Sequence, residues 1–231
     1  MCRWIDPEIK RLLEYASPTR PQVLEIGCGD GWLLESYADR ADVTGVEPDP
    51  QMISESPRRQ WIQHRSWAAG PPEPAPPRQD IVFMFDVLEH IEDEPRALRE
   101  IHDVLKPGGV LVMSVPACPG LWSDHDVVNN HFRRYTREGL KTALMDSGLQ
   151  VEQCHALFAW LLLPLWFRKQ LRPARGAPPN GPRSPESLPA LPGPALNALL
   201  LALSRVDHRI CASLNLGSGT TLLAVARKQS E

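Results

Sequence analysis

The stretch VLEIGCGDGW, from Val23 to Trp32, places three glycines and two acids directly after residues that are typical of a β-strand. Gly27, Gly29 and Gly31 let the chain turn sharply, and they let a ligand approach main-chain N–H groups without a Cβ in the way. The next residues, WLLESYAD, resume the spacing of a helix. We therefore expect a strand, a bare loop and a helix, with a nucleotide-like ligand at the loop; the alternative is a tight turn that binds nothing.

The residues downstream of this loop alternate between strand and helix patterns. Strands are predicted within DVTGVEP, which reaches Glu47, and within IQHRSW, DIVFMFDVLEHI and PGGVLVMSVP. The helix EPRALREIHDVLK separates the last two of these strands. Because such alternation is typical of βαβ units, we expect a parallel sheet.

The second half of the chain continues this pattern and then departs from it. A helix with Thr136 as its N-cap precedes a strand in VEQCHALFAW, and GTTLLAVARK predicts a closing strand. Between these strands lie an apolar run, LFAWLLLPLWF, a proline-rich stretch from 172 to 194 and an apolar helix, ALNALLLALSRVDHRICASL. A leading amphipathic helix is predicted from Ile5 to Ala16.

Composition narrows the class of protein. A chain of 231 residues favours one α/β domain with an elaboration. The formal charge of −3 is not typical of nucleic-acid binders, so no nucleic-acid partner is expected. The five cysteines are scattered without a C-x-x-C pair, which predicts neither a disulfide framework nor a zinc site and fits the cytoplasm. The amino end lacks the apolar core of a signal peptide.

A dinucleotide is one of two classes of nucleotide ligand that suit a glycine loop followed by an acid on the next strand. Glu47 lies about twenty residues beyond the loop, where a carboxylate can accept hydrogen bonds from ribose hydroxyls. The dinucleotide fingerprint, G-x-G-x-x-G, requires a third glycine where this chain has Trp32. A dehydrogenase is therefore disfavoured.

Four segments together carry a family resemblance. The pattern E-x-G-x-G-x-G beginning at Glu25, then GVEPD, FDVLEHIED and LKPGGVLVMSVP, resembles the motifs of class I S-adenosylmethionine-dependent methyltransferases of the type 11/12 kind, in that family's order. The resemblance covers roughly residues 20 to 160. It implies an α/β fold: a Rossmann-like, seven-stranded, mostly parallel sheet with a reversed last strand, which TLLAVARK could supply, and helices on both faces.

The same resemblance implies a set of residues around S-adenosylmethionine. Its methionine and ribose portions would lie along the glycine loop, with Glu47 on the ribose, and the adenine near the third strand. The residues implied are Glu25, Gly27, Cys28, Gly29, Gly31, Glu47, Ser66, Trp67, Asp86 and Val87. Ser66 and Trp67 stand where the family commonly has an acid, so this chain departs from the pattern there.

The segment after the last parallel strand is the expected acceptor side, because ligands of open α/β sheets bind at the carboxyl ends of the strands. It contains WSDHD and HFRRYT, with His125, His131 and Tyr135 as candidate catalytic residues. Histidine titrates near neutrality and suits general-base work on an acceptor hydroxyl. The alternative is a lid held together by hydrogen bonds and ion pairs.

The same segments are similar to ubiquinone-biosynthesis O-methyltransferases, whose acceptors carry polyprenyl tails. This favours O-methylation of a small, hydrophobic or lipid-linked acceptor, the alternative being a degenerate fold that binds a cofactor or partner without turnover. DVLEH also resembles a run that holds a divalent metal in some of those enzymes, which would place one on Asp86, Glu89 and His90. Those acids also suit the cofactor pocket, and no metal is predicted.

The apolar segments near the carboxyl end have two interpretations. They are either buried helices that cover the sheet or an interfacial surface, at 156–175 and 195–203, that contacts a membrane from the cytoplasmic side. The run at 157–167 is too short and too interrupted by proline to span a bilayer. We expect one domain over 1–231, with a core at 20–160, an apolar and proline-rich helical elaboration at 161–216 and a closing strand and tail at 217–231.

Overall fold

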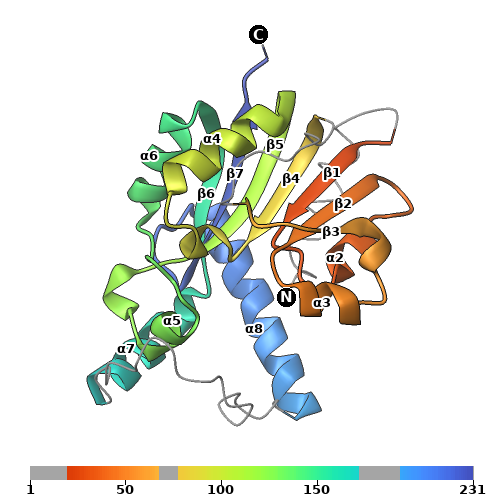
Figure 1. Ribbon diagram of the computed structural model, residues 1–231. Helices are drawn as coiled ribbons and strands as arrows, with labels where there is room; N and C mark the ends of the chain where they lie inside the picture. The colour runs from red at the N-terminus through yellow and green to blue at the C-terminus, as the bar shows by residue number, and fades with distance from the viewer. Residues whose placement is uncertain (1–19, 68–77, 172–192, 231) are drawn as a thin grey trace.

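Seven strands form one sheet of order β3-β2-β1-β4-β5-β7-β6 in the computed structural model, which describes residues 20–67, 78–171 and 193–230 (Figure 1). The strands are β1 Gln22–Ile26, β2 Asp42–Glu47, β3 Ile62–His64, β4 Gln79–Phe85, β5 Leu105–Pro116, β6 Leu149–Leu157 and β7 Thr221–Lys228. Strands β1 to β5 pair in parallel, whereas β7 runs antiparallel to both β5 and β6. The predicted mostly parallel sheet with a reversed last strand is confirmed.

Helices of very different length connect these strands. They are α2 Trp32–Glu35, α3 Pro50–Glu55, α4 Glu94–Val104, α5 Asp124–Val128, α6 Arg137–Asp146, α7 Leu162–Leu171 and α8 Pro194–Ser213. Short 3-10 turns add η4 Leu88–His90, η5 Pro119–Leu121 and η6 Ala159–Leu161. Helices α4 and α6 cover one face of the sheet and α2 the other (Figure 1). The predicted helices on both faces are therefore confirmed.

The central strands are apolar on both sides because both faces of the sheet are covered. On β4, Val82 and Met84 join the cluster under α4 and α6, while Ile81 and Phe83 join the cluster on the other face. Successive side chains of β4 point to opposite faces, and both faces are covered, so residues 81–85 of the strand are all apolar. The sequence therefore shows an unbroken apolar run rather than an alternation of apolar and polar residues.

Helix boundaries follow from the capping residues. Asp93 accepts the backbone N–H of Arg96 at the start of α4, and Thr136 accepts that of Gly139 at the start of α6, as predicted for Thr136. The predicted helix WLLESYAD is wrong in length, because only Trp32–Glu35 is α-helical. After it, Tyr37 N–H donates to Leu34 O, three residues back, so the turn tightens and the helix ends.

The apolar elaboration lies mostly on the surface. Cys211 is the one buried residue of α8 among the residues described, and α7 has none. The interpretation of these segments as buried helices is therefore wrong for α7 and α8. No helix in the described ranges has the length and apolar composition needed to cross a membrane. The leading helix at 5–16 and most of the proline-rich stretch lie outside the described residues.

Strands β6 and β7 are adjacent, although 63 residues separate Leu157 from Thr221, which stand opposite each other in the register. Thr220 N–H donates to Leu157 O at 3.0 Å. The chain therefore leaves β6 and enters β7 at the same end of the sheet.

Candidate cofactor and acceptor site

The glycine loop begins where β1 ends and adopts a conformation that side chains disfavour. Gly27, Gly29 and Gly31 have φ of 71°, 54° and 74°, the left-handed region in which glycine carries no Cβ penalty. A Cβ on Gly27 would lie 2.4 Å from Cγ2 of Val87, whereas one on Gly29 would meet only Met52 Sδ, at 3.4 Å. Gly27 is therefore required for packing, and Gly29 leaves an open surface.

The backbone N–H groups of this loop are largely used within the protein. Gly27 and Cys28 both donate to Val46 O, and Gly31 donates to Cys28 O. Gly29 donates to Glu47 Oε2 at 3.0 Å. A pyrophosphate needs several free N–H donors at such a loop, so the geometry disfavours a dinucleotide. Our expectation that a ligand would meet these N–H groups was wrong for these four residues.

Glu47 stands at the carboxyl end of β2 with its side chain fixed from two sides. Its Oε2 accepts Gly29 N–H and its Oε1 accepts Asp49 N–H, each at 3.0 Å. A carboxylate offers about four acceptor positions, so both oxygens can still accept hydrogen bonds from hydroxyl groups. The side chain is buried at the edge of the sheet, next to the loop.

Glu25 lies on β1, beneath the loop, with one oxygen unsatisfied. The residue is buried, and Oε2 has no hydrogen-bond partner. Burial, with repulsion from Asp30 and Glu47, raises the pKa of Glu25 to about 8. Burial, with the charges of Glu25 and Glu47, raises the pKa of the Cys28 thiol to about 12, so this sulfur is neutral and packs rather than reacts.

Asp86 and Val87 follow β4, and Val87 lies against the glycine loop. Asp86 has a φ of 54°, and its Oδ1 accepts a hydrogen bond from Ser114 Oγ at 3.0 Å. Burial raises the pKa of Asp86, against the hydrogen bond from Ser114, which lowers it. Ser114 was not among the predicted residues, although a single hydroxyl in the apolar run VLVMSVP was a visible signal.

Ser66 and Trp67, the predicted adenine contacts, are connected to the glycine loop less directly than the residues above. Ser66 is exposed, while Trp67 is buried in the core with Nε1 donating to Ala97 O at 3.4 Å. The Arg65 guanidinium lies 5.5 Å from the centre of the Trp67 ring. Arg65 N–H donates to Glu47 O, which ties this segment to the loop. The adenine contacts stay a prediction.

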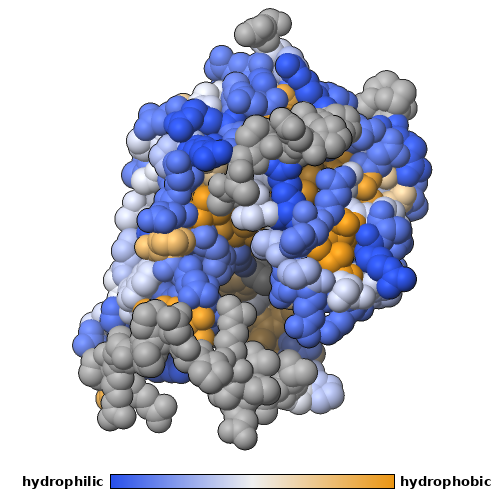
Figure 2. Space-filling view, in the orientation of Figure 1, coloured by the Kyte–Doolittle hydropathy of each residue, from blue (hydrophilic) through white to orange (hydrophobic). Residues whose placement is uncertain are grey.

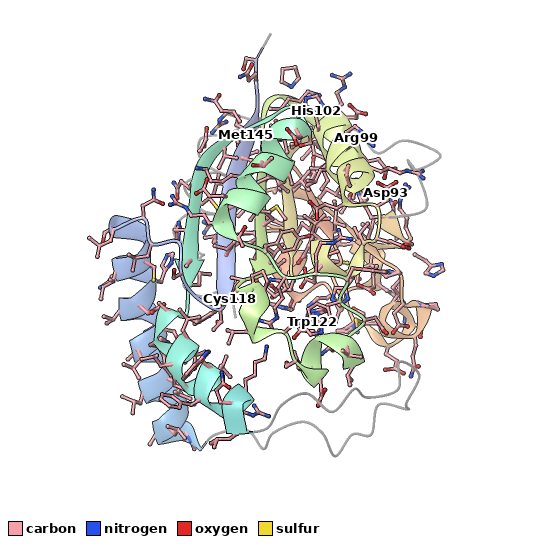
Figure 3. The ribbon with its side chains drawn as sticks, turned by 90° about the vertical axis from the view of Figure 1, so that its left-hand side faces the viewer. Asp93, Arg99, His102, Cys118, Trp122 and Met145 are labelled. Atoms are coloured by element: carbon pink, nitrogen blue, oxygen red, sulfur yellow. The ribbon has the colours of Figure 1, made fainter. Side chains whose placement is uncertain are left out.

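The segment from Ala117 to Tyr135 forms the other side of the site. Ala117 and Tyr135 pair as an isolated bridge, so the segment leaves the sheet and returns to it. Cys118 and Trp122 mark its course below the end of β5 in Figure 3. The space-filling view shows a hollow near the middle of the molecule, bordered by both hydrophilic and hydrophobic residues (Figure 2).

Asp126 organises this segment from a fully buried position. Arg134 donates to it from Nε and Nη2 at 2.7 and 3.0 Å, and Ser123 N–H donates to Oδ2 at 2.8 Å. Its relative exposure is 0%. Burial acts to raise the pKa of Asp126, but the hydrogen bonds from Arg134 and Ser123 outweigh it and hold the pKa below its usual range. The carboxylate is therefore charged near neutral pH.

His131 is held by this carboxylate. Its Nδ1 lies 3.1 Å from Asp126 Oδ1, and a carboxylate only accepts hydrogen bonds, so Nδ1 carries the proton and Nε2 is the basic nitrogen. Burial lowers the pKa of His131 against the opposing effect of Asp126. His125, by contrast, is exposed, with its ring 6.3 Å from that of His131.

Glu89 connects the two halves of the site. Its relative exposure is 1%, and Oε2 has no partner. Burial raises the pKa of Glu89 to about 8, and the nearby charges of Asp86, Arg134 and Asp126 also act on it. Glu89 therefore lies between the cofactor residues and the group formed by Asp126, Arg134 and His131.

Tyr135 has a structural partner. Its hydroxyl donates to Glu94 Oε2 at 2.9 Å, and Arg133 Nη1 donates to the same oxygen at 3.0 Å. Burial, with the charge of Glu94, raises the pKa of Tyr135. The structure thus brings His131 to the site, whereas it engages the Tyr135 hydroxyl elsewhere.

The family model for a methyltransferase domain matches residues 1–154 of this chain. The chain belongs to this family. A relative of this chain is named as a probable S-adenosylmethionine-dependent methyltransferase, so the expected class is confirmed.

Curated relatives of this chain are named as methyltransferases. A protein of Mycolicibacterium smegmatis named a probable S-adenosylmethionine-dependent methyltransferase is 32% identical over 142 residues, covering 59% of this chain and 54% of the relative. A ubiquinone biosynthesis O-methyltransferase of Pseudomonas aeruginosa is 32% identical over 118 residues, covering 48% of each chain. The chain thus spans about half the length of these relatives.

Solved structures agree on the fold. An S-adenosylmethionine-dependent methyltransferase from Mesorhizobium loti superposes with a TM-score of 0.58 at 16% identity, covering 97% of each chain. At this identity the likeness concerns the fold alone. It supports the Rossmann-like arrangement of the methyltransferase domain.

The residues around the loop fit the cofactor of this family. S-adenosylmethionine carries positive charge on its sulfonium and ammonium groups, and Glu25 presents a buried, unsatisfied carboxyl oxygen. Glu47 has acceptor positions left for ribose hydroxyls, and Gly29 leaves an open surface. A divalent ion has a candidate set in Glu89, His90 and His131, whose ligand atoms lie within 4.8 Å of one another. The expectation of no metal stays a prediction.

Proposed function

We propose that this methyltransferase-domain protein transfers a methyl group from S-adenosylmethionine to an oxygen of a small, hydrophobic or lipid-linked acceptor. When bound, the cofactor supplies an electrophilic methyl group on sulfur. Glu25 would accept the positive end of the cofactor, Glu47 its ribose hydroxyls, and Asp86 with Val87 would line the remaining wall. The rest of the predicted set completes this part of the proposal: Gly27, Cys28, Gly29, Gly31, Ser66 and Trp67.

The observation that carries the choice of oxygen is the pairing of His131 with Asp126. A hydroxyl acceptor must lose its proton during an in-line displacement, and a neutral imidazole with a basic Nε2 can take it. Asp126 holds the ring in that tautomer and stabilises the imidazolium that forms, because its charge is maintained by Arg134. His125 remains the alternative base, although it is exposed.

Glu89 would orient the acceptor. With a pKa near 8, most of the carboxyl is protonated at neutral pH, so it can donate a hydrogen bond to an oxygen of the acceptor. One of its oxygens has no hydrogen-bond partner, and a carboxyl oxygen of Glu89 lies within 4.8 Å of a ring nitrogen of His131. A neutral group there also avoids placing a second negative charge beside Asp86.

The hydrophobic character of the acceptor rests on the surfaces next to the site. Hydrophobic residues are among those that border the hollow of Figure 2, and exposed apolar side chains within 163–171 and 195–203 continue this apolar character on α7 and α8. A ubiquinone biosynthesis O-methyltransferase among the relatives agrees with such an acceptor. The same proposal treats residues 1–231 as one domain, with 20–160 as the cofactor-binding core, 161–216 as the acceptor-side elaboration and 217–231 as closing strand and tail.

The proposal is tested by methyl transfer with radiolabelled cofactor and a panel of phenols with and without isoprenoid tails, followed by mass spectrometry of the product. We expect a gain of one methyl on oxygen, with the tailed phenols preferred. Transfer to amines alone would contradict the choice of oxygen. Cofactor binding without transfer to any acceptor would favour the degenerate, binding-only alternative.

A matched pair of variants separates chemistry from binding. His131→Gln should lower kcat by roughly 10²- to 10⁴-fold, the usual contribution of a general base, with S-adenosylhomocysteine affinity unchanged. His125→Gln, on the exposed neighbour, should leave kcat within about threefold of the wild type. An equal loss in both variants would contradict the assignment of His131. Adding a chelator in parallel tests the expectation that no metal takes part.

A further inference from the structure

Helix α8 carries a row of exposed apolar side chains along one side. The spacing of three and four residues places them on one helical stripe, and each is more than two-fifths exposed. The residues of this stripe are Leu196, Leu199, Leu203, Val206 and Ile210, continued by Leu214 at the C-cap of the helix.

Helix α7 presents a second apolar surface at the same end of the molecule. Leu163 is 69% exposed, Leu171 82%, and Trp166 packs edge-to-face on Phe167 with ring centres 5.2 Å apart while both remain about half exposed. Exposed aromatic and leucine side chains in such number are uncommon on a protein that meets only water. They indicate contact with another apolar phase or surface.

The charges on these two helices are almost all positive. They carry Arg168, Lys169, Arg205 and Arg209 but a single acid, Asp207. The Asp207 carboxylate accepts the backbone N–H groups of Ala159 and Trp160, so it anchors α8 to η6. Within the described ranges, none of Arg168, Arg205 and Arg209 forms an ion pair. The basic charge is therefore available to an anionic partner.

This surface adjoins the acceptor side of the site. Lys169 Nζ donates to Gly120 O at 2.6 Å, which fixes α7 against η5 in the segment that leads to Asp126. Figure 1 and Figure 3 both place α7 and α8 at the end of the molecule where α5 lies.

We propose that α7 and α8 form a docking surface for the face of an anionic lipid bilayer, from which the acceptor enters the site. Aromatic and aliphatic side chains would enter the boundary between headgroups and acyl chains, and the arginines would meet the lipid phosphates. The proposal deepens the proposed function, because it names the source of the acceptor. Vesicle binding is measured without methyl transfer, so the two can fail separately.

The test is flotation of the full chain with vesicles of phosphatidylcholine alone and with about one third phosphatidylglycerol. We expect binding to the anionic vesicles, several-fold weaker binding to the neutral ones, and loss of binding as salt is raised through roughly 0.5 M, because salt screens the headgroup charge. No binding to anionic vesicles would overturn the proposal.

Variants identify the surface. Trp166→Ser with Phe167→Ser, and separately Leu199→Ser with Val206→Ser, should each weaken vesicle binding at least about tenfold. Met145→Ser, on the exposed side of α6, and Arg99→Gln, on α4, serve as apolar and cationic controls that should bind as the wild type does (Figure 3). Arg205→Gln with Arg209→Gln should weaken binding at least about fivefold.

Two further outcomes would overturn the proposal. Binding that is unchanged in all of these surface variants would place the contact elsewhere. Concentration-dependent dimerisation, seen by analytical ultracentrifugation and lost in the same variants while vesicle binding stays unaffected, would assign the stripe to a second copy of the chain. Each folded variant is checked by its affinity for S-adenosylhomocysteine, which a change on α7 or α8 should not alter.

Discussion

The carboxylate of Glu47 accepts the backbone N–H of Gly29, so the end of β2 holds in place the loop that follows β1. We predict that Glu47→Gln weakens S-adenosylhomocysteine binding by about tenfold or more, since one hydrogen bond to a charged group contributes roughly 1.5–3 kcal/mol. Calorimetry measures the affinity. Asp49→Asn, a change to an exposed neighbour at the start of α3, is the control and should bind normally.

Two glycines of one loop should respond differently to alanine. Gly27→Ala should be strongly destabilising, because its Cβ would lie 2.4 Å from Val87 Cγ2, and Val87→Ala in the same chain should recover part of the loss. Gly29→Ala should cost only about 1–2 kcal/mol of backbone strain, yet it should impair cofactor binding. Thermal unfolding and calorimetry separate the two effects. Equal destabilisation by both substitutions would contradict this account.

Glu25 makes cofactor binding depend on pH. Its folded pKa, near 8 against an ordinary 4.5, means that the free protein holds a proton there at pH 7. The positively charged cofactor prefers the ionised form, so affinity should rise as pH rises towards 8 and above, and binding at pH 7 should release a proton. Calorimetry in buffers of different ionisation enthalpy measures this release. Glu25→Gln should bind more weakly and should release no proton.

The unfolding of the free protein supplies an independent check on Glu25. Because its pKa is raised in the folded state, the folded protein binds more protons than the unfolded chain between about pH 4.5 and 8. The proton bound to Glu25 therefore contributes fully to stability below about pH 4.5, the pKa of the unfolded chain. This contribution is lost as pH rises through about 8, the pKa in the folded protein. Relative to Glu25→Gln, the wild type should lose about 5 kcal/mol of unfolding free energy across this window. A parallel pH dependence in both proteins would contradict a raised pKa.

The Tyr135 hydroxyl should contribute to stability rather than to chemistry. Tyr135→Phe removes its hydrogen bond to Glu94, which should cost about 1–2 kcal/mol of unfolding free energy. It should leave kcat within about threefold. Thermal unfolding and methyl transfer are measured on the same preparation, and a loss of more than a hundredfold in kcat with normal stability would restore Tyr135 as a catalytic residue.

More of the fold than of the site could be predicted from the sequence. The strands were visible because both sides of the sheet are buried, which produces unbroken apolar runs such as IVFMF in β4. The sequence could not show that α2 ends after Glu35, because that depends on the hydrogen bonds that Ser36 and Tyr37 N–H make in the turn. It also could not show that α7 and α8 are exposed, since buried and interfacial helices share an apolar composition.

Within the site, the sequence identified the residue types but not their partners. Glu47, Asp86 and His131 were recognisable by their positions after strands or in a polar segment. The central role of Asp126 depends on its complete burial and on the approach of Arg134 from eight residues away. The unsatisfied oxygens of Glu25 and Glu89 likewise depend on what packs around them. Such contacts are properties of the folded chain.

The opposition of Leu157 and Thr221 has a consequence for how this protein can change. Since β6 and β7 are antiparallel neighbours, α7, α8 and the rest of the intervening chain form, in topological terms, one greatly enlarged hairpin loop. The entropic cost of closing a loop grows only slowly with its length. Insertions, deletions or a wholesale exchange of this loop would therefore leave the order of the seven strands and the cofactor loop intact. On the proposal that α7 and α8 meet the bilayer, the surface attachment can accordingly evolve, or be engineered, as a replaceable module.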